Sequence, residues 1–513
     1  MNIQTAIRDL AAYAYHTGLV TEEDLIYTLN SFASFFGLFE LESTPKEIMK
    51  RSASISGTDI ETGYDLKKLL TFLSDYLKEQ HLLPHHSTEE SVFARIMSLI
   101  TPAPSQINRI FKEKYAQSPK EAMDWFYQFS KNTNYVKRYQ LSQHTAWAAF
   151  TSYGDLNITI DASSDPILFH PEEYSSYTEH NYPNCILCRE NIGYPGHLSY
   201  PSGKNRRSIP INLKGKEYQF QFLPSAAYPE LFTLSSAEHN PAIINKEAFA
   251  RLLTFVERFP QYFIGQNADL PIVSASLDEH EHLFGATFES GLAKAEIESA
   301  FSVKGYKKVS CGILKWPTSV IRLISKEQDP LVNLADQLLE AWKSYSDPSI
   351  DLISESSGKK HNTFTLIARK RRDAFELDLI LRNNRRDKEH PDGIFYPRRE
   401  YHHLMYRSIG VLELSGLMIF PCQLKSDLQQ IEAALAEKRS LASSADMRRH
   451  VDWSRQIRQE YKTLSADNVS SILKKEVGMS CLHMLEDSAV FKRDSEGQDA
   501  FARFILSLEA IFD

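Results

Sequence analysis

Two histidines separated by a single residue, His280 and His282, have the spacing that most directly suggests chemistry in this sequence. Side chains alternate between the two faces of an extended strand, so these two imidazoles would project to the same side, about 7 Å apart. One could bind a metal ion while its neighbour attacks a substrate. Taken alone, the pair favours a plainer interpretation, two solvated histidines at a strand end, so its weight depends on ligand-type residues elsewhere.

A second candidate is the Cys-x-x-Cys pair Cys185 and Cys188, which lies among turn-forming residues in NYPNCILCRENIGYPG. Such a loop suits two thiolates on one tetrahedral metal ion. A redox pair is the rival interpretation, although the thioredoxin-like strand–helix–strand setting is missing, and two inert buried cysteines are the third. A metal site needs two more ligands, for which His239 and His280 are candidates, but spacing cannot select two of the 17 histidines.

Composition places the chain among soluble globular proteins with a large core: 513 residues, 42% hydrophobic and 24% charged. The formal net charge of −8 excludes a global basic field that would recruit nucleic acid. The first residues lack the pattern of a secretory signal, and no window approaches the roughly 20 apolar residues of a membrane span. Because the five cysteines form no disulfide framework, we expect a cytoplasmic protein. The negative net charge and the lack of a long apolar window predict that it has no nucleic-acid or membrane partner.

Hydrophobic periodicity predicts helices up to about residue 150, including one that begins near Thr21 and others over 91–99 and 107–115. From residue 151, alternating stretches predict strands mixed with helices. The clearest strands are expected at 156–160, 218–222 and 375–381, and the clearest helices at 246–259, 330–345, 426–437 and from 451 onward. Short strands mixed with helices indicate an α+β fold with largely antiparallel sheet.

The order of these motifs resembles the class II galactose-1-phosphate (UDP-glucose–hexose-1-phosphate) uridylyltransferases, a family of the histidine-triad-like superfamily. The similar segments run in one order along nearly the whole chain. They include YGDLNITI, NYPNCILCRENIGYPG, RRSIPINL, SSAEHNPAIIN, FPQYFIGQNADLPIV, the histidine pair, FELDLILRNNR and IGVLELSGLMIFP. Many dispersed matches in one order are more specific than any single motif.

The resemblance implies an α+β fold with two histidine-triad-like halves, an N-terminal helical region and C-terminal helices. The expected units are a helical region over residues 1–150, a half with the metal site and nucleophile over 151–310, a second half over 311–425 and a helical segment over 426–513. The resemblance also implies uridylyl exchange between UDP-glucose and galactose 1-phosphate, in galactose metabolism. A homodimer is the expected assembly.

The resemblance assigns roles to particular residues. It implies a structural zinc ion held by Cys185, Cys188, His239 and His280, and it makes His282 the nucleophile that forms a uridylyl-histidine. Asn267 matches an asparagine that contacts the nucleotide phosphates. Arg207 lies in the arginine-plus-IPI motif near the nucleotide, and Arg206 is the alternative at that place.

The chain departs from the family pattern at this site. Phe284 stands where the family has a glutamine, as in HDHYQGG, that hydrogen-bonds the phosphoryl group. Losing one such donor typically costs about 10²–10³ in rate. Family glycines are replaced at 274–275 by Ser-Ala, and Asp278-Glu279 places negative charge near a phosphate site. The usual FHPH is Phe395-Tyr396-Pro397-Arg398 here, which argues against a second metal site in the C-terminal half.

Three functions remain open. A working transferase would need a rebuilt site, with Arg398 or another residue supplying the missing donor. A paralogue without transfer activity would bind nucleotide sugars as a sensor, and a nucleotidyl hydrolase would use water as the acceptor. Phe284→Gln is expected to raise transfer if the missing donor is limiting, and to leave it unchanged or lower if the pocket is rebuilt around Phe284.

Other motifs receive structural interpretations. The basic runs at 369–372 and 382–386 are predicted to be solvated turns, and the histidines at 85–86 a solvated loop. His361 is expected near a sugar phosphate or in a turn. The remaining predictions are core or interface positions for Trp147 and Trp316 and buried thiols for Cys311, Cys422 and Cys481.

Overall fold

The computed structural model of the chain describes residues 1–55, 57, 64–83, 87–163, 182–197, 200–225, 227–271, 280–437, 439–441 and 447–512. The predictions for residues 85–86, 274–275 and 278–279 lie outside this part of the chain. Among the helices of the described residues, none has the length and apolar character needed to cross a membrane.

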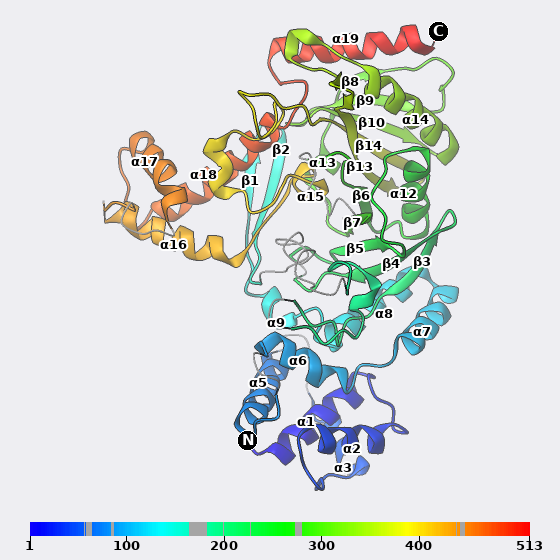
Figure 1. The fold of residues 1–513 in the computed structure, drawn as a ribbon, viewed down its shortest axis with the longest axis vertical. Helices are drawn as coiled ribbons and strands as arrows, with labels where there is room; N and C mark the ends of the chain where they lie inside the picture. The colour runs from blue at the N-terminus through cyan, green and yellow to red at the C-terminus, as the bar shows by residue number, and fades with distance from the viewer. Residues whose placement is uncertain are drawn as a thin grey trace.

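The N-terminal region is helical, as predicted, and forms the lower end of the molecule in Figure 1. Local sequence signals explain several helix starts: Thr44 and Glu47 form a capping box, and a proline begins the helices at residues 45, 104 and 119. The helices are α1 (Ile3–His16), α2 (Leu25–Phe35), α3 (Pro45–Ser52), α5 (Tyr64–Glu79), α6 (Glu89–Ser98), α7 (Pro104–Gln117), α8 (Pro119–Asn132) and α9 (Arg138–Leu141).

A ten-stranded sheet, in which every neighbouring pair is antiparallel, runs through the centre of the molecule. Its order is β3-β4-β5-β7-β6-β13-β14-β10-β9-β8. The strands are β3 (Ile209–Leu213), β4 (Lys216–Phe222), β5 (Phe232–Ser236), β6 (Phe263–Gln266), β7 (His282–Ala286), β8 (Ile297–Phe301), β9 (Ser310–Leu314), β10 (Val320–Ser325), β13 (Asn362–Arg371) and β14 (Ala374–Asn383). The prediction of an α+β fold with largely antiparallel sheet is confirmed.

The sheet divides into two sets of five strands that meet where β6 pairs with β13. The first set is contributed by residues 209–286 and the second by residues 297–383. This arrangement agrees with two successive halves, whereas the four-unit division at residues 150, 310 and 425 stays a prediction.

Alternation along the strands gives the sheet two different faces. One face packs on the long helices α12 (Lys246–Arg258) and α14 (Gln328–Ser344), through residues such as Leu234, Leu283 and Leu366. The opposite face, which we call the site face, carries Phe284, Ile367 and Ile380 in a separate apolar cluster. That cluster includes residues of α13 (Gly291–Lys294), α15 (Val411–Leu414) and a three-stranded sheet of β1 (Thr145–Thr151), β2 (Gly154–Ile160) and β15 (Leu417–Phe420).

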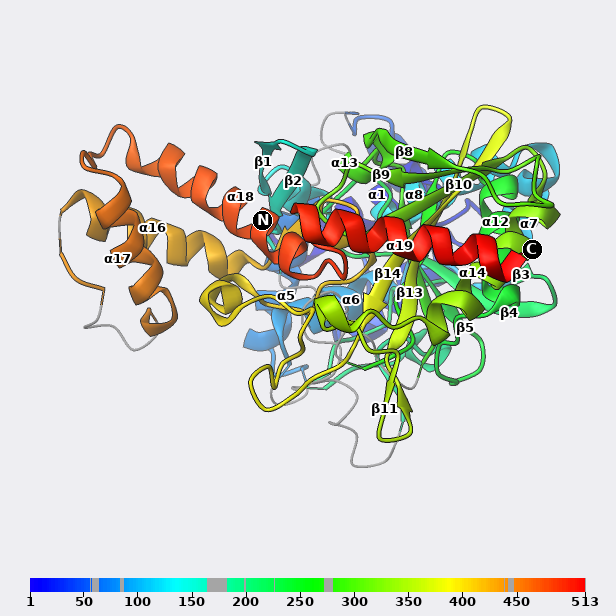
Figure 2. The ribbon, with the colours of Figure 1, turned by 90° about the horizontal axis from the view of Figure 1, so that it is seen from above.

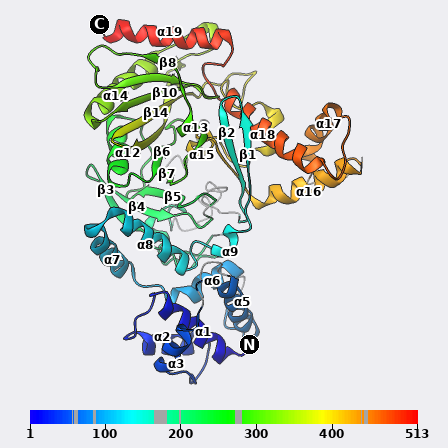
Figure 3. The ribbon, with the colours of Figure 1, turned by 180° about the vertical axis from the view of Figure 1, so that it is seen from behind.

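The C-terminal helices extend the structure in two directions. Helices α16 (Cys422–Ala436), α17 (Val451–Glu460) and α18 (Val469–Asp487) form an arm that projects from the body, as Figure 2 shows. Helix α19 (Ser495–Phe512) contacts α14 and lies at the end of the molecule opposite α1, seen from behind in Figure 3. The short elements are β11 (Glu355–Ser356), β12 (Lys359–Lys360) and the 3-10 turns at Arg189–Asn191, Pro348–Ile350, Arg399–Leu404 and Arg448–His450.

Several structural predictions need correction. The prediction of solvated turns for the two basic runs is only partly correct. Arg371 and Arg372 are exposed at the β13–β14 turn and Arg386 is exposed beyond β14, as predicted. Arg369 in β13 and Arg382 in β14 are instead buried. Arg369 can be buried because its guanidinium pairs with Glu376 and Asp378 on the neighbouring strand, partners that the local sequence does not reveal. Cys422 is exposed rather than buried, since it begins α16 at the surface. The core position of Trp316 is confirmed.

A buried ion cluster joins three neighbouring strands on the site face. Asp378 on β14 accepts hydrogen bonds from Arg322 on β10 (2.6 Å from Nε) and from Arg369 on β13 (2.6 Å from Nη2). Burial by itself would raise the pKa of Asp378, but the two guanidinium groups outweigh it and hold the pKa below its usual value. Removing one partner of such a cluster leaves uncompensated charge inside the protein.

We therefore expect Asp378→Asn to lower the free energy of unfolding by about 3–5 kcal/mol at pH 7, measured by urea denaturation. Because the folded pKa is lowered, this stabilisation is complete above about pH 4 and is lost as the pH falls through the folded pKa. The difference between wild type and variant should therefore shrink in acid. Asp373→Asn removes the exposed partner of Lys326 in the β13–β14 turn; it is the control and should leave the urea midpoint nearly unchanged. Equal losses in the two variants would contradict the prediction.

Candidate active site

Four ligand-type side chains, far apart in the sequence, meet at the edge of the site face. The Sγ of Cys185 lies 3.1 Å from Nδ1 of His280, and the Sγ of Cys188 lies 3.1 Å from Nδ1 of His239. The two sulfur atoms are 3.4 Å apart, and all four ligand atoms lie within 4.8 Å of one another. Two thiols and two imidazoles in this arrangement could hold a metal ion.

The protonation of the cluster also fits a metal ion. Nε2 of His280 lies 2.8 Å from the carbonyl oxygen of Ser236, so Nε2–H donates there and Nδ1 is left with its lone pair toward the thiols. The hydrogen bond from Cys188 lowers the pKa of Cys185. The same hydrogen bond, together with burial, raises the pKa of Cys188 to about 12. The donors present therefore include an unprotonated ring nitrogen and two neighbouring thiols, groups that bind a metal ion with release of their protons.

Hydrogen bonds from two side chains to the backbone carbonyls fix the loop that carries the two cysteines. The amide of Asn191 donates to the carbonyl oxygens of Cys185 (2.7 Å) and Cys188 (3.0 Å). The guanidinium of Arg206 donates to the carbonyl oxygens of Ile186 (2.8 Å) and Leu187 (3.4 Å). All four carbonyls of the loop thus have partners, which fixes the direction of both thiols.

The residue between the two histidines points to the opposite face. Glu281 is buried, and its carboxylate accepts hydrogen bonds from Tyr218 and Lys216 of β4 and lies 3.6 Å from Arg251 of α12. This anchor on the helix side leaves His280 and His282 on the site face, as the strand periodicity predicts. The role of Glu281 was not apparent in the sequence, because its partners come from distant elements.

His282 is the first residue of β7 and is 5% exposed. Its Nδ1 lies 3.0 Å from the backbone carbonyl of His280, so Nδ1–H donates and the lone pair lies on Nε2. Burial lowers the pKa of His282 to about 4, so the ring is neutral at pH 7. A neutral imidazole with one oriented nitrogen can act as a nucleophile.

Asn267 and Phe284 lie next to this histidine. Asn267 follows β6 one position beyond the Gln266–Leu283 pair, which places it beside His282 by register. Its Oδ1 accepts from the N–H of Val411 at 2.8 Å, while its buried Nδ2 has no partner among the described residues. The ring of Phe284 meets the ring of His282 edge-on, with centroids 4.9 Å apart.

Arg207 is engaged elsewhere. Its guanidinium donates to the carbonyl oxygens of Pro102 (2.7 Å), Thr101 (3.1 Å) and Arg206 (2.7 Å), and so joins the N-terminal helices to the sheet region. These bonds describe a structural tie, and the nucleotide contact suggested for Arg207 stays a prediction. Arg398, suggested as a replacement donor, instead pairs with Asp487 of α18 at 3.1 Å.

Arg407 is a residue near the site that the sequence did not reveal. Its charge adds to the lowering of the pKa of His282, whose main cause is burial, and it pairs with Glu413 at 3.1 Å. Glu413 in turn accepts the N–H of Gly410 at the start of α15. Arg407 directly precedes the segment SIGVLELSG, but only the packing of α15 against β13 brings it toward the histidine.

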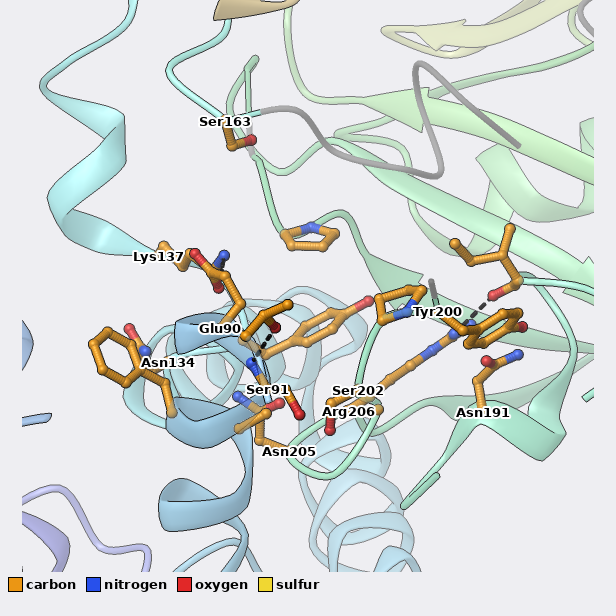
Figure 4. A pocket seen from close by; sticks show the side chains of 18 of the residues that line it. Glu90, Ser91, Asn134, Lys137, Ser163, Asn191, Tyr200, Ser202, Asn205 and Arg206 are labelled. Carbon is orange, nitrogen blue, oxygen red and sulfur yellow. Dashed lines mark hydrogen bonds and ion pairs between the residues drawn. The ribbon is translucent and has the colours of Figure 1, made fainter. Parts of the chain in front are cut away.

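A cavity of about 380 Å³ lies between the cysteine loop and the N-terminal helices. Figure 4 shows Asn134, Lys137, Tyr200, Asn205 and Arg206 around it. Lys137 and Glu90, which both line the cavity, form an ion pair. The lining combines aromatic rings with neutral and charged hydrogen-bonding groups, as in a pocket for a small polar molecule.

The fold and the site together define an α+β protein in which a Cys₂His₂ cluster adjoins a buried, neutral histidine. Comparison with known proteins then identifies the family. Models of the galactose-1-phosphate uridyl transferase N-terminal and C-terminal domains match residues 51–244 and 255–454.

Curated relatives named galactose-1-phosphate uridylyltransferase match nearly end to end. That of Clostridium acetobutylicum is 38% identical over 508 residues, covering 98% of this chain and 99% of the relative, and that of Bacillus subtilis is 35% identical over 519 residues, covering 99% and 98%. Yeast Ap4A phosphorylase Apa2 superposes with a TM-score of 0.36 at 10% identity, covering 63% of this chain and 92% of that one. The chain belongs to the galactose-1-phosphate uridylyltransferase family, and the predicted family is confirmed.

The metal cluster makes a direct prediction. Cys185→Ser removes one of four ligands, so the purified protein should lose its bound metal, measured by elemental mass spectrometry, and should unfold at a lower temperature. Cys422→Ser changes an exposed thiol outside the cluster and is the matched control. Full metal content in Cys185→Ser would show that the cluster is not the metal site.

Proposed function

We propose that this chain catalyses uridylyl transfer between UDP-glucose and galactose 1-phosphate, with His282 as the covalent nucleophile. The observation that carries the proposal is the fixed tautomer of His282: its Nδ1–H is bound by the His280 carbonyl, so Nε2 is the reactive nitrogen. The nucleotidyltransferase family to which the chain belongs supports the same reaction class.

The reaction is a double displacement. Nε2 of His282 attacks the α-phosphorus of UDP-glucose, a bond forms between nitrogen and phosphorus, and the bond from that phosphorus to the bridging oxygen breaks. Glucose 1-phosphate leaves with the electron pair. A phosphate oxygen of galactose 1-phosphate then attacks the uridylyl-histidine, which forms UDP-galactose and restores His282. Splitting one transfer into two displacements lowers the barrier of each.

The neighbouring groups have supporting roles in this proposal. The free Nδ2–H of Asn267 donates to a phosphate oxygen, and the positive charge of Arg407 stabilises the anionic nucleotide. Zinc is the metal best suited to Cys185, Cys188, His239 and His280, where it would be structural. These residues position His280, and His280 in turn presents the carbonyl that orients His282.

Incubation with UDP-glucose alone tests the proposal. The wild type should release glucose 1-phosphate and carry UMP on His282, detected by mass spectrometry of peptides under conditions that preserve phosphoramidates. His282→Asn should bind UDP-glucose but carry no label. UMP on another residue would overturn the mechanism.

The other two functions give different results in the same experiment. Binding of UDP-glucose without any label would favour a nucleotide-sugar sensor. Release of free UMP in the absence of galactose 1-phosphate would favour a hydrolase. The homodimer expected for the protein stays a prediction, which sedimentation analysis can check.

A further inference from the structure

Two hydroxyl groups on β5 lie beside the histidine site without any assigned role. In the register of β5 and β7, Ser235 stands directly opposite His282, and Thr233 stands directly opposite Phe284. Directly opposite residues of an antiparallel pair project to the same face, with Cβ atoms about 4.5–5.5 Å apart. Both hydroxyls therefore lie on the site face, Ser235 beside His282 and Thr233 beside Phe284.

These hydroxyls are buried and have no hydrogen-bond partner among the described residues. Ser235 is 1% exposed and Thr233 is fully buried. An unpartnered hydroxyl inside a protein destabilises the fold, and alanine or valine would fill the same space without that cost. Two such groups on one strand, facing the same site, point to a ligand that supplies their partners.

The position of the hydroxyls identifies the part of the ligand that they would meet. Asn267 flanks His282 from β6, and Ser235 flanks it from β5, so donors stand on both sides of the nucleophile. The group that passes through His282 in the proposed function is an anionic phosphoryl group, which requires such donors. Phe284, packed edge-on against His282, has no donor to offer.

We propose that Ser235 and Thr233 bind the transferred phosphoryl group and replace the side-chain donor that is missing at position 284. The proposal rests on the proposed function, because it takes the phosphoryl group from that reaction. It makes both hydroxyls substrate-binding groups of this chain. It also explains why a phenylalanine is compatible with the site: the donors come from the neighbouring strand.

Ser236 provides a matched control on the same strand. Its side chain lies on the opposite face, and its Oγ donates to the carbonyl oxygen of Glu238 at 2.6 Å. Removing the Ser236 hydroxyl breaks a bond within the protein, whereas removing the Ser235 hydroxyl breaks none among the described residues. Ser236→Ala should therefore lower the free energy of unfolding, whereas Ser235→Ala should not.

The test measures equilibrium binding of UMP by calorimetry, since UMP carries the phosphoryl group and has no sugar phosphate to expel. Ser235→Ala and Thr233→Val should each weaken UMP binding by about 10-fold to 100-fold, the usual range for a hydrogen bond to a charged group. Their urea midpoints without ligand should be unchanged or higher. Ser236→Ala keeps the backbone carbonyl that accepts from His280 and should unfold at lower urea.

Unchanged UMP affinity in both Ser235→Ala and Thr233→Val would overturn the proposal, as would a loss of stability equal to that of Ser236→Ala. If the hydroxyls contribute to UMP binding but UDP-glucose leaves no label on His282, the proposed function fails, and Ser235 and Thr233 are binding groups for a nucleotide phosphate that is not transferred. If His282 is labelled normally in both hydroxyl variants and UMP affinity is unchanged, only this assignment fails. If the wild type does not bind UMP, the assignment of Ser235 and Thr233 is overturned as well.

The same proposal predicts the effect of Phe284→Gln. Because Phe284 is 5% exposed and packs against His282, a glutamine would bury an amide where the donors are already supplied. We expect transfer from UDP-glucose to galactose 1-phosphate to stay the same or to fall. A clear gain in rate, with Ser235→Ala as active as the wild type, would show that the donor at 284 was missing and not replaced.

Discussion

The site depends on the attachment of one short segment, His280 to His282, from both sides of the sheet. On one side His280 belongs to the Cys₂His₂ cluster and donates to the carbonyl of Ser236. On the other side Glu281 is held by Tyr218 and Lys216. Alternate residues are therefore fixed in opposite directions, and the carbonyl of His280 is fixed with them. That carbonyl selects the tautomer of His282, so the reactivity of one nitrogen depends on contacts made two residues away.

The antiparallel register determines which groups surround this nitrogen. Strand β5 lies on one side of β7 and strand β6 on the other, so Ser235 and Asn267 approach His282 from opposite directions. A shift of one residue in either strand would turn these polar groups into the helix-packed core. The apolar positions on the helix side, such as Leu234 and Leu283, fix the register because α12 and α14 cover them. Core packing on one face thus sets the polar chemistry on the other.

Charged side chains have different roles in the two halves of the sheet. In the second half, Asp378 and two arginines form a buried ion cluster that joins three strands. In the first half, neutral donors and a neutral histidine face the site, and the charged groups Glu281 and Arg206 are used to hold strands and loops. The two halves share a strand pattern, but the first half alone combines a metal-type cluster with an oriented nucleophile among the described residues.

Many of the strands and helices could be predicted from residue types and spacing, and the members of the ligand cluster from the family resemblance. Period-two alternation identified β2, β4 and β14, and period-3.6 patterns identified α2, α6, α7, α12 and α14, because these signals depend only on which side of an element is buried. The motifs around Cys185, His239 and His280 resembled one family strongly enough to suggest a common cluster, whose members the structure brings within reach of one another. Tertiary structure alone decided the rest. The burial of Arg369, the approach of Arg407, the anchor on Glu281 and the hydroxyls opposite His282 all depend on strand order and register, which pair residues that are distant in the chain and leave no local pattern in it.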